Sequence, residues 1–270
     1  MGLGESGGRA LTALPAAVLG PRMRALGRQE PARWVLTLCQ SAGEGGGCFA
    51  SPRQHVYVPA GFAGDPARAA EEAARRARKK LRRYTVANGL NRLGTLTYGP
   101  PRCSDPREVR EHVGLFFRQL REGLGGERLP YVWVPELHKD GVHFHVHFAV
   151  GRFVRQDLIK ATWGRGFVGI KRIGNMPVGS GRWEQARRNA GYLSKYVSKT
   201  FTEPGLRPPG MHRYEVGQGF QPKETRLTGC SVQDVLDQAS GLMGSTPVYL
   251  WSSAEKEDWQ GPPSIWARWD

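Results

Sequence analysis

Three histidines alternate in the middle of the chain, at His143, His145 and His147. In an extended strand alternate side chains point to the same face, so all three imidazoles would share one face and apolar side chains would fill the other. A divalent metal requires neutral imidazoles and would remove their mutual repulsion. The spacing therefore predicts a metal site, although a polar strand face that happens to be rich in histidine remains an alternative.

A second strand precedes the histidines and ends near Asp140-Gly141, a dipeptide that favours a tight hairpin turn. If these two residues form the loop, Glu136 pairs with His145 and His138 pairs with His143, and all four share one face. A carboxylate beside imidazoles suits Mg²⁺ or Mn²⁺ and would also hold Zn²⁺. A loop of three residues would instead move Glu136 to the opposite face.

Two tyrosines follow in the repeated pattern Tyr192-Leu-Ser-Lys195 and Tyr196-Val-Ser-Lys199. On a helix both tyrosines lie on one face, away from the apolar stripe. They could simply be half-buried aromatic side chains at a boundary. Beside a cation or a metal, however, a phenol becomes a usable nucleophile, and each tyrosine has a lysine three residues later. Together with the predicted metal site, Tyr192, Tyr196, Lys195 and Lys199 indicate transesterification of a phosphodiester.

The composition agrees with a polyanionic partner. The 270 residues include 39 Lys plus Arg against 24 Asp plus Glu, a formal net charge of +15. Such an excess favours nucleic acid over an acidic membrane surface, and no apolar run is long enough to span a bilayer. The four cysteines have no paired spacing, which argues against a zinc finger or a disulfide scaffold and favours a reducing, cytoplasmic setting.

The pattern of elements predicts an α+β fold with a central antiparallel sheet and helices packed on one side of it. We expect a nuclease and DNA-binding domain at 63–203, a partly irregular extension at 1–62 and a turn-rich extension at 204–270. Two apolar runs, 34–39 and 55–58, could add edge strands. The other expected elements are helices at 66–84, after Pro106, at 156–163 and at 181–200, strands at 93–98 and 167–173, and a hairpin at 131–150.

The helix at 66–84 carries a dense run of cations after the N-cap Asp65. A solvated helix face is the alternative, but such density is typical of a surface that follows a phosphate backbone. The residues predicted to contact DNA are Arg75, Arg76, Arg78, Lys79, Lys80, Arg82 and Arg83.

Three segments, Leu93–Tyr98, Glu136–His147 and Tyr192–Lys199, resemble in type and order the motifs of the HUH endonucleases. The resemblance spans about residues 75–200 and is strongest to the two-tyrosine rolling-circle replication initiators of plasmids and single-stranded DNA phages. It implies a ferredoxin-like or RRM-like sheet and DNA recognition by the first motif, where Thr95 and Thr97 are candidates. The implied metal ligands are His143, His145 and Glu136, with His138 and His147 left open.

The same resemblance implies a mechanism. A tyrosine attacks single-stranded origin DNA, in a hairpin, to form a 5′-phosphotyrosine link and a free 3′-hydroxyl, with Mg²⁺ or Mn²⁺ as cofactor. The second tyrosine would later cut again and rejoin the strand, and a host helicase and polymerase are the implied partners. Which tyrosine acts first stays open. Four other functions also remain open: a relaxase, a single-stranded DNA transposase, a non-catalytic DNA-binding regulator with a structural metal, and a hydrolase that uses water.

Overall fold

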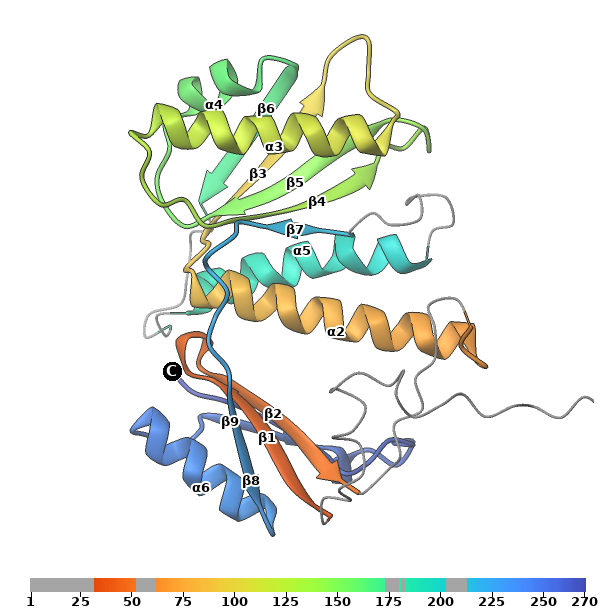
Figure 1. Cartoon of the computed structure of the whole chain (residues 1–270), viewed down its shortest axis with the longest axis vertical. Coiled ribbons are helices and arrows are strands. Elements are labelled where there is room, and N and C mark those ends of the chain that lie inside the picture. Colours follow the sequence, from red (N-terminus) through yellow and green to blue (C-terminus); the bar gives the residue numbers. More distant parts are fainter. Residues whose placement is uncertain (1–31, 52–61, 173–179, 181–182, 203–212) are drawn as a thin grey trace, which may run out of the picture.

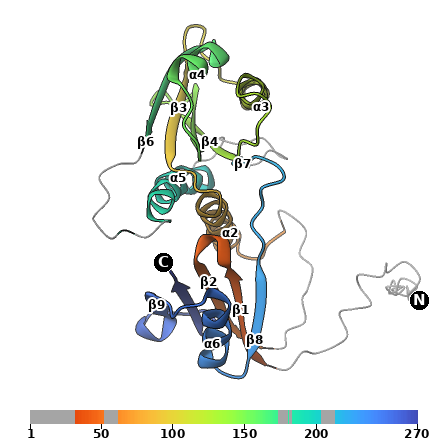
Figure 2. The same cartoon turned by 90° about the vertical axis from the view of Figure 1, so that its left-hand side faces the viewer.

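The computed structural model describes residues 32–51, 62–172, 180, 183–202 and 213–270. These residues form two five-stranded antiparallel sheets and five α-helices. Two of the helices, α2 (Pro66–Ala87) and α5 (Glu184–Thr202), lie between the two sheets (Figures 1 and 2). The prediction of an α+β fold with antiparallel strands is confirmed.

The first sheet, called here the site sheet, has the strand order β6-β3-β5-β4-β7. Its strands are β3 (Arg92–Tyr98), β4 (Tyr131–Leu137), β5 (Phe144–Val150), β6 (Gly166–Arg172) and β7 (Glu215–Val216). The central position of β5, between β3 and β4, puts the histidine strand in the middle of the sheet. Gly94 of β3 allows this close packing, because a Cβ there would lie 2.2 Å from the ring of Phe148 on β5.

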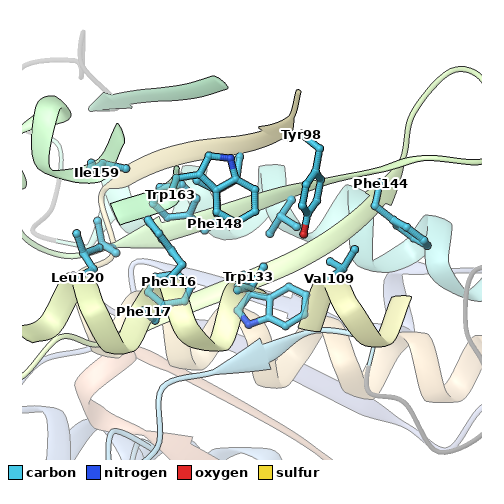
Figure 3. Close-up of a cluster of buried hydrophobic side chains, with 14 of the residues drawn as sticks. Tyr98, Val109, Phe116, Phe117, Leu120, Trp133, Phe144, Phe148, Ile159 and Trp163 are labelled. Carbon is cyan, nitrogen blue, oxygen red and sulfur yellow. The ribbon is translucent and has the colours of Figure 1, made fainter. Parts of the chain in front are cut away.

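Helices α3 (Pro106–Gly123) and α4 (Gln156–Trp163) cover one face of the site sheet. The apolar stripe of α3 fits against aromatic side chains of the strands, and Phe116, Phe148 and Trp163 meet edge to face in this core (Figure 3). The helix begins at a proline after Asp105, whose side chain accepts a hydrogen bond from the Arg107 amide.

Helices α2 and α5 cover the other face of the site sheet, so helices lie on both sides and not on one side as expected. The reason lies in the strands, because β4 buries Val132 and Val134 on the face opposite Trp133. Leu81 of α2 and Leu193 of α5 are fully buried in this second core. All the helices and strands predicted between residues 66 and 202 are present with ends within three residues of expectation.

The second sheet joins segments from both ends of the described chain, in the order β8-β1-β2-β10-β9. Helix α6 (Val232–Met243) packs on one of its faces. The described part of 204–270 is thus more regular than the turn-rich extension expected there, and the strand predicted at 34–39 is internal, not at an edge. The run at 55–58 lies outside the described residues. The strands are β1 (Arg33–Cys39), β2 (Glu44–Ala50), β8 (Thr225–Gly229), β9 (Tyr249–Ser252) and β10 (Ser264–Arg268), with short 3-10 turns at Gln40–Ala42 and Ser253–Glu255.

Candidate metal and tyrosine site

The hairpin of β4 and β5 has the register that the sequence predicts. Glu136 is directly opposite His145, and the His138 amide donates to the His143 carbonyl oxygen at 2.6 Å. The loop is longer than two residues, with a turn closed by the Gly141 amide and the His138 carbonyl at 2.9 Å. Because the loop keeps the same parity, Glu136 still shares a face with the histidines.

Three side chains converge on that face: Glu136, His145 and His147. Glu136 Oε2 lies 2.8 Å from Nε2 of each histidine, and the two Nε2 atoms lie 3.1 Å apart. One ligand atom from each of the three residues lies within 4.8 Å of the others. Two imidazole nitrogens and a carboxylate oxygen directed at one point fit the ligand set of Mn²⁺, Mg²⁺ or Zn²⁺, so the residues present suit a divalent metal.

His147 is held from three sides. Its ring is buried, its Nδ1 lies 3.2 Å from Thr95 Oγ1 on β3, and the Tyr196 ring of α5 stacks on it with centroids 3.9 Å apart. Burial, together with the charges of His145 and Lys199, lowers the pKa of His147 despite the Glu136 carboxylate, which favours the neutral imidazole. When Nδ1 carries the proton, the Thr95 hydroxyl can accept a hydrogen bond from it, and Nε2 is then the nitrogen that can act as a ligand.

Glu136 is the most connected group of the site. Lys199 of α5 forms an ion pair with its Oε1, while its Oε2 contacts both histidines. Burial by itself would raise the pKa of Glu136, but the hydrogen bonds from Lys199, His147 and His145 outweigh it and hold the pKa below its ordinary value. The carboxylate is therefore ionised at neutral pH, as a metal ligand has to be.

Both tyrosines of α5 reach this cluster. The Tyr196 hydroxyl donates to the Tyr192 hydroxyl at 2.6 Å, and the Tyr192 ring lies 6.0 Å from that of His147, edge to face. Tyr196 is only 7% exposed whereas Tyr192 is 40% exposed. Burial and the hydrogen bond with Tyr192 raise the pKa of Tyr196. Of the two lysines predicted beside them, Lys199 joins the cluster and Lys195 is exposed and has no ion pair among the described residues.

His143 lies outside the cluster, although the sequence pairs it with His145 as a ligand. Its Nδ1 is 2.9 Å from Asp140 Oδ2 in the turn, and the same oxygen lies 3.6 Å from His138 Nδ1. Hydrogen bonds from the backbone and ring of His143 hold the pKa of Asp140 below its ordinary range. His147, left open by the sequence, takes the place expected of His143 because β3 and α5 pack around it.

The two threonines of β3 lie beside the histidines. Thr95 pairs across the strands with His147 and Thr97 with His145, so both share the face of the cluster. The Thr95 hydroxyl contacts a histidine ring, and its contact with DNA stays a prediction. The alternation of Thr95 and Thr97 in the sequence already indicates that both threonines share one face of their strand. The sequence does not show that β3 pairs with β5, so the contact with His147 could not be predicted.

The basic helix α2 divides into two sides. Arg83 is 1% exposed, with Nε 3.0 Å from Glu44 Oε1 and Nη1 2.6 Å from Glu224 Oε1, so the prediction that it contacts DNA is wrong. Arg82 pairs with the same buried Glu44 at 2.7 Å. These contacts join the helix to the second sheet. The other predicted DNA contacts are exposed or half-buried on α2, namely Arg75, Arg76, Arg78, Lys79 and Lys80.

Comparison with known proteins agrees with this geometry. Residues 91–201 match the family model described as Replication-associated protein ORF2/G2P. The matched segment runs from β3 to α5 and so contains the threonines, the metal cluster and the tyrosine pair. It supports a replication initiator that acts on DNA. No curated protein and no solved structure matches the chain. Within the described residues no helix combines the length and apolar character needed to cross a bilayer.

Proposed function

We propose that the chain is a rolling-circle replication initiator of the HUH type that nicks single-stranded origin DNA by tyrosine transesterification. The observation that carries the proposal is the hydrogen-bonded pair Tyr192 and Tyr196, packed against His147 of a cluster that could hold a metal ion. The family match at residues 91–201 favours replication over plasmid transfer or transposition. A regulator with a structural metal would have no need of two phenols beside the cluster.

The proposed reaction forms one bond and breaks one. The phenol oxygen bonds to the scissile phosphorus, the bond from phosphorus to the 3′ oxygen breaks, and the proton lost by the phenol is balanced by one gained at that oxygen. The products are a 5′-phosphotyrosine and a free 3′-hydroxyl. A divalent metal on Glu136, His145 and His147 would polarise the phosphate and offset charge on its non-bridging oxygens. Lys199, whose Nζ lies 5.6 Å from the centre of the Tyr196 ring, adds positive charge beside the phenols.

The two tyrosines have different surroundings, which supports different roles. Tyr192 is the more exposed, and its oxygen accepts the hydrogen bond from Tyr196, so it can reach DNA without rearrangement of α5. We therefore propose Tyr192 as the first nucleophile. Tyr196 positions Tyr192 in the first step and becomes available once Tyr192 is attached to DNA and the hydrogen bond between them has broken.

The experiment is covalent capture. A labelled single-stranded oligonucleotide that carries the origin hairpin is incubated with the protein and Mn²⁺ or Mg²⁺, and the adduct is located by mass spectrometry of peptides. We expect the adduct on Tyr192, its loss in Tyr192→Phe, and a slower reaction in Tyr196→Phe. Tyr131→Phe is the matched control, because Tyr131 stacks on Phe117 on the opposite face of the site sheet.

Each alternative gives a different result. An adduct that persists in the Tyr192→Phe/Tyr196→Phe double variant would overturn the assignment of the nucleophiles. Cleavage without any adduct would indicate a hydrolase that uses water. Metal and DNA binding without cleavage, on every origin hairpin tested, would indicate a regulator.

The exposed side of α2 is a candidate for part of the DNA-binding surface. Arg76 and Lys80 are exposed and one turn apart, so they share a face of the helix. We propose that they contact phosphates next to the site. The Arg76→Ala/Lys80→Ala variant should then show a shallower dependence of DNA affinity on salt, by roughly 1.4 in the logarithmic slope for two contacts to a single strand. A slope equal to that of the wild type would remove α2 from the DNA surface.

A further inference from the structure

The second sheet carries a row of aromatic side chains on the face opposite α6. Strand β9 pairs with β10 so that Trp251 is directly opposite Trp266 and Tyr249 opposite Arg268. Directly paired residues share a face, and the rings of Tyr249 and Trp266 lie 5.7 Å apart. We call this surface the aromatic face.

Along β10 the aromatic face is more open than the opposite face. On β9, at the edge of the sheet, both faces are open, because Leu250 on the α6 side is 44% exposed. On the α6 side, Ile265 and Ala267 of β10 are buried in the core. On the aromatic face, Tyr249 is 47% exposed and the rings of Trp251 and Trp266 are partly exposed. Large aromatic side chains usually go to the buried side of a sheet, so their position on the open side indicates a surface that binds a partner.

Positive charge accompanies the rings. Across strands β2, β1 and β8, the residues in register with Trp266 are Gly46, Thr37 and Arg226 in turn, and they form one row. Arg82 of α2 lies over the Trp266 ring, with its Cζ atom 5.4 Å from the ring centre. Gly46 has no side chain, and the Trp266 ring lies over this position, since a Cβ on Gly46 would be 3.2 Å from Trp266 Cδ1.

The acidic groups beside this row are paired with arginines. Glu44, which is 2% exposed, pairs with Arg82 and Arg83, and Glu224 pairs with Arg83. Asp270 pairs with Arg187 and lies 3.9 Å from Arg268. Three further acidic residues, Glu255, Glu257 and Asp258, follow β9 in sequence beyond Trp251. The row from Trp266 to Arg226 therefore presents stacking surfaces and cations, and arginines neutralise the carboxylates beside it.

We propose that the aromatic face is a second binding site for single-stranded DNA, separate from the tyrosine site. Unpaired bases would stack on Tyr249, Trp251 and Trp266, and phosphates would contact Arg226 and Arg268. Stacking on aromatic side chains requires an unpaired base, since neighbouring bases in a duplex cover both faces of each base. The arginines would neutralise the phosphates of the DNA backbone. The choice of DNA as the occupant rests on the proposed function. The binding itself needs neither a metal nor a tyrosine nucleophile.

The test separates binding from cleavage. A fluorescent thymidine oligomer of about 15 nucleotides, a length that an aromatic surface of this kind can hold, is titrated with protein in a chelator. The Tyr192→Phe/Tyr196→Phe background prevents any covalent product. Tyr249→Ala/Trp251→Ala should weaken binding by about tenfold or more, because two stacking positions are lost. Leu242→Ala is the matched control, because Leu242 is equally exposed, at 46%, on α6.

A second measurement locates the DNA directly. Photocrosslinking of an oligomer that contains halogenated uracil, followed by mass spectrometry, should give crosslinked peptides from 249–268. Equal affinities of the aromatic and control variants, or crosslinks found only elsewhere, would overturn the proposal. Loss of a dimer in Tyr249→Ala/Trp251→Ala with unchanged DNA affinity would also overturn it and indicate a second copy of the chain as the occupant.

The two proposals can fail independently. If the aromatic face binds DNA but no tyrosine adduct forms on any origin hairpin, the proposed function fails and the binding site stands. If an adduct forms on Tyr192 and the aromatic variants bind as tightly as their background, the binding site fails and the proposed function stands.

Discussion

The contact between Thr95 and His147 offers a sharp test of the metal site. Thr95→Val keeps the shape of the side chain and removes the hydroxyl that lies 3.2 Å from Nδ1 of His147. When Nε2 of a histidine binds a metal, Nδ1 carries the proton and needs an acceptor, and loss of such a partner typically lowers metal affinity about 10–100-fold. This contact is long and half-buried, so we expect the lower end, about tenfold or ~1.4 kcal/mol of binding free energy.

The assay is titration with Mn²⁺, followed by the paramagnetic resonance signal of the free ion. Thr97→Val is the matched control, because Thr97 lies on the same face of β3 opposite His145 and its hydroxyl makes no side-chain hydrogen bond among the described residues. An affinity of Thr95→Val equal to that of the wild type, or an equal loss in Thr97→Val, would refute the reasoning. This titration measures metal affinity alone, so its result depends neither on cleavage nor on DNA.

Three further predictions follow from the same structure. His147→Ala should lower Mn²⁺ affinity by well over tenfold whereas His143→Ala should leave it within about twofold, and equal losses in a metal titration would restore His143 as a ligand. Arg83→Ala leaves the buried Glu44 with Arg82 as its remaining partner and removes the ion pair with Glu224, so urea unfolding should show a loss near the lower end of about 3–5 kcal/mol that the Arg83→Ala/Glu44→Ala pair partly recovers; a loss under about 1 kcal/mol would contradict this. Asp234 completes the capping box of α6, in which Ser231 is the N-cap. Hydrogen bonds from Ser231 hold the pKa of Asp234 below its ordinary value, so its stabilising effect is present above about pH 4 and lost as the pH falls. The stability difference between the wild type and Asp234→Asn should therefore vanish in acid, and a difference that persists at low pH would exclude a charge effect.

The sequence determined the chemistry that the hairpin can perform. The period of two in a strand puts His145, His147 and Glu136 on one face whatever else the chain does, provided that the loop keeps its parity. The helical spacing of Tyr192 and Tyr196 likewise fixes them on one side of α5. These features depend on neighbours along the chain, and for that reason they could be derived from residue order alone.

Only the tertiary structure decided which members of each set act together. Thr95 and Tyr196 enclose His147 from other elements, while Asp140 in the turn engages His143, and so His147 lies in the cluster that could hold a metal ion. The contacts of Thr95 and Tyr196 with His147 join residues tens of positions apart, which no local pattern encodes, whereas the contact of Asp140 with His143 is local.

The same limit applies to the charges and to the aromatic face. A run of cations on a helix has the same pattern whether it meets DNA or a carboxylate, and Arg83 is buried because Glu44 and Glu224, far away in sequence, come to it. The row of rings on β9 and β10 likewise arises from pairing with β2, which begins at Glu44 near the other end of the chain. Local periodicity fixed the faces of the elements, and long-range packing decided which face each one meets, because burial and pairing are properties of the folded whole.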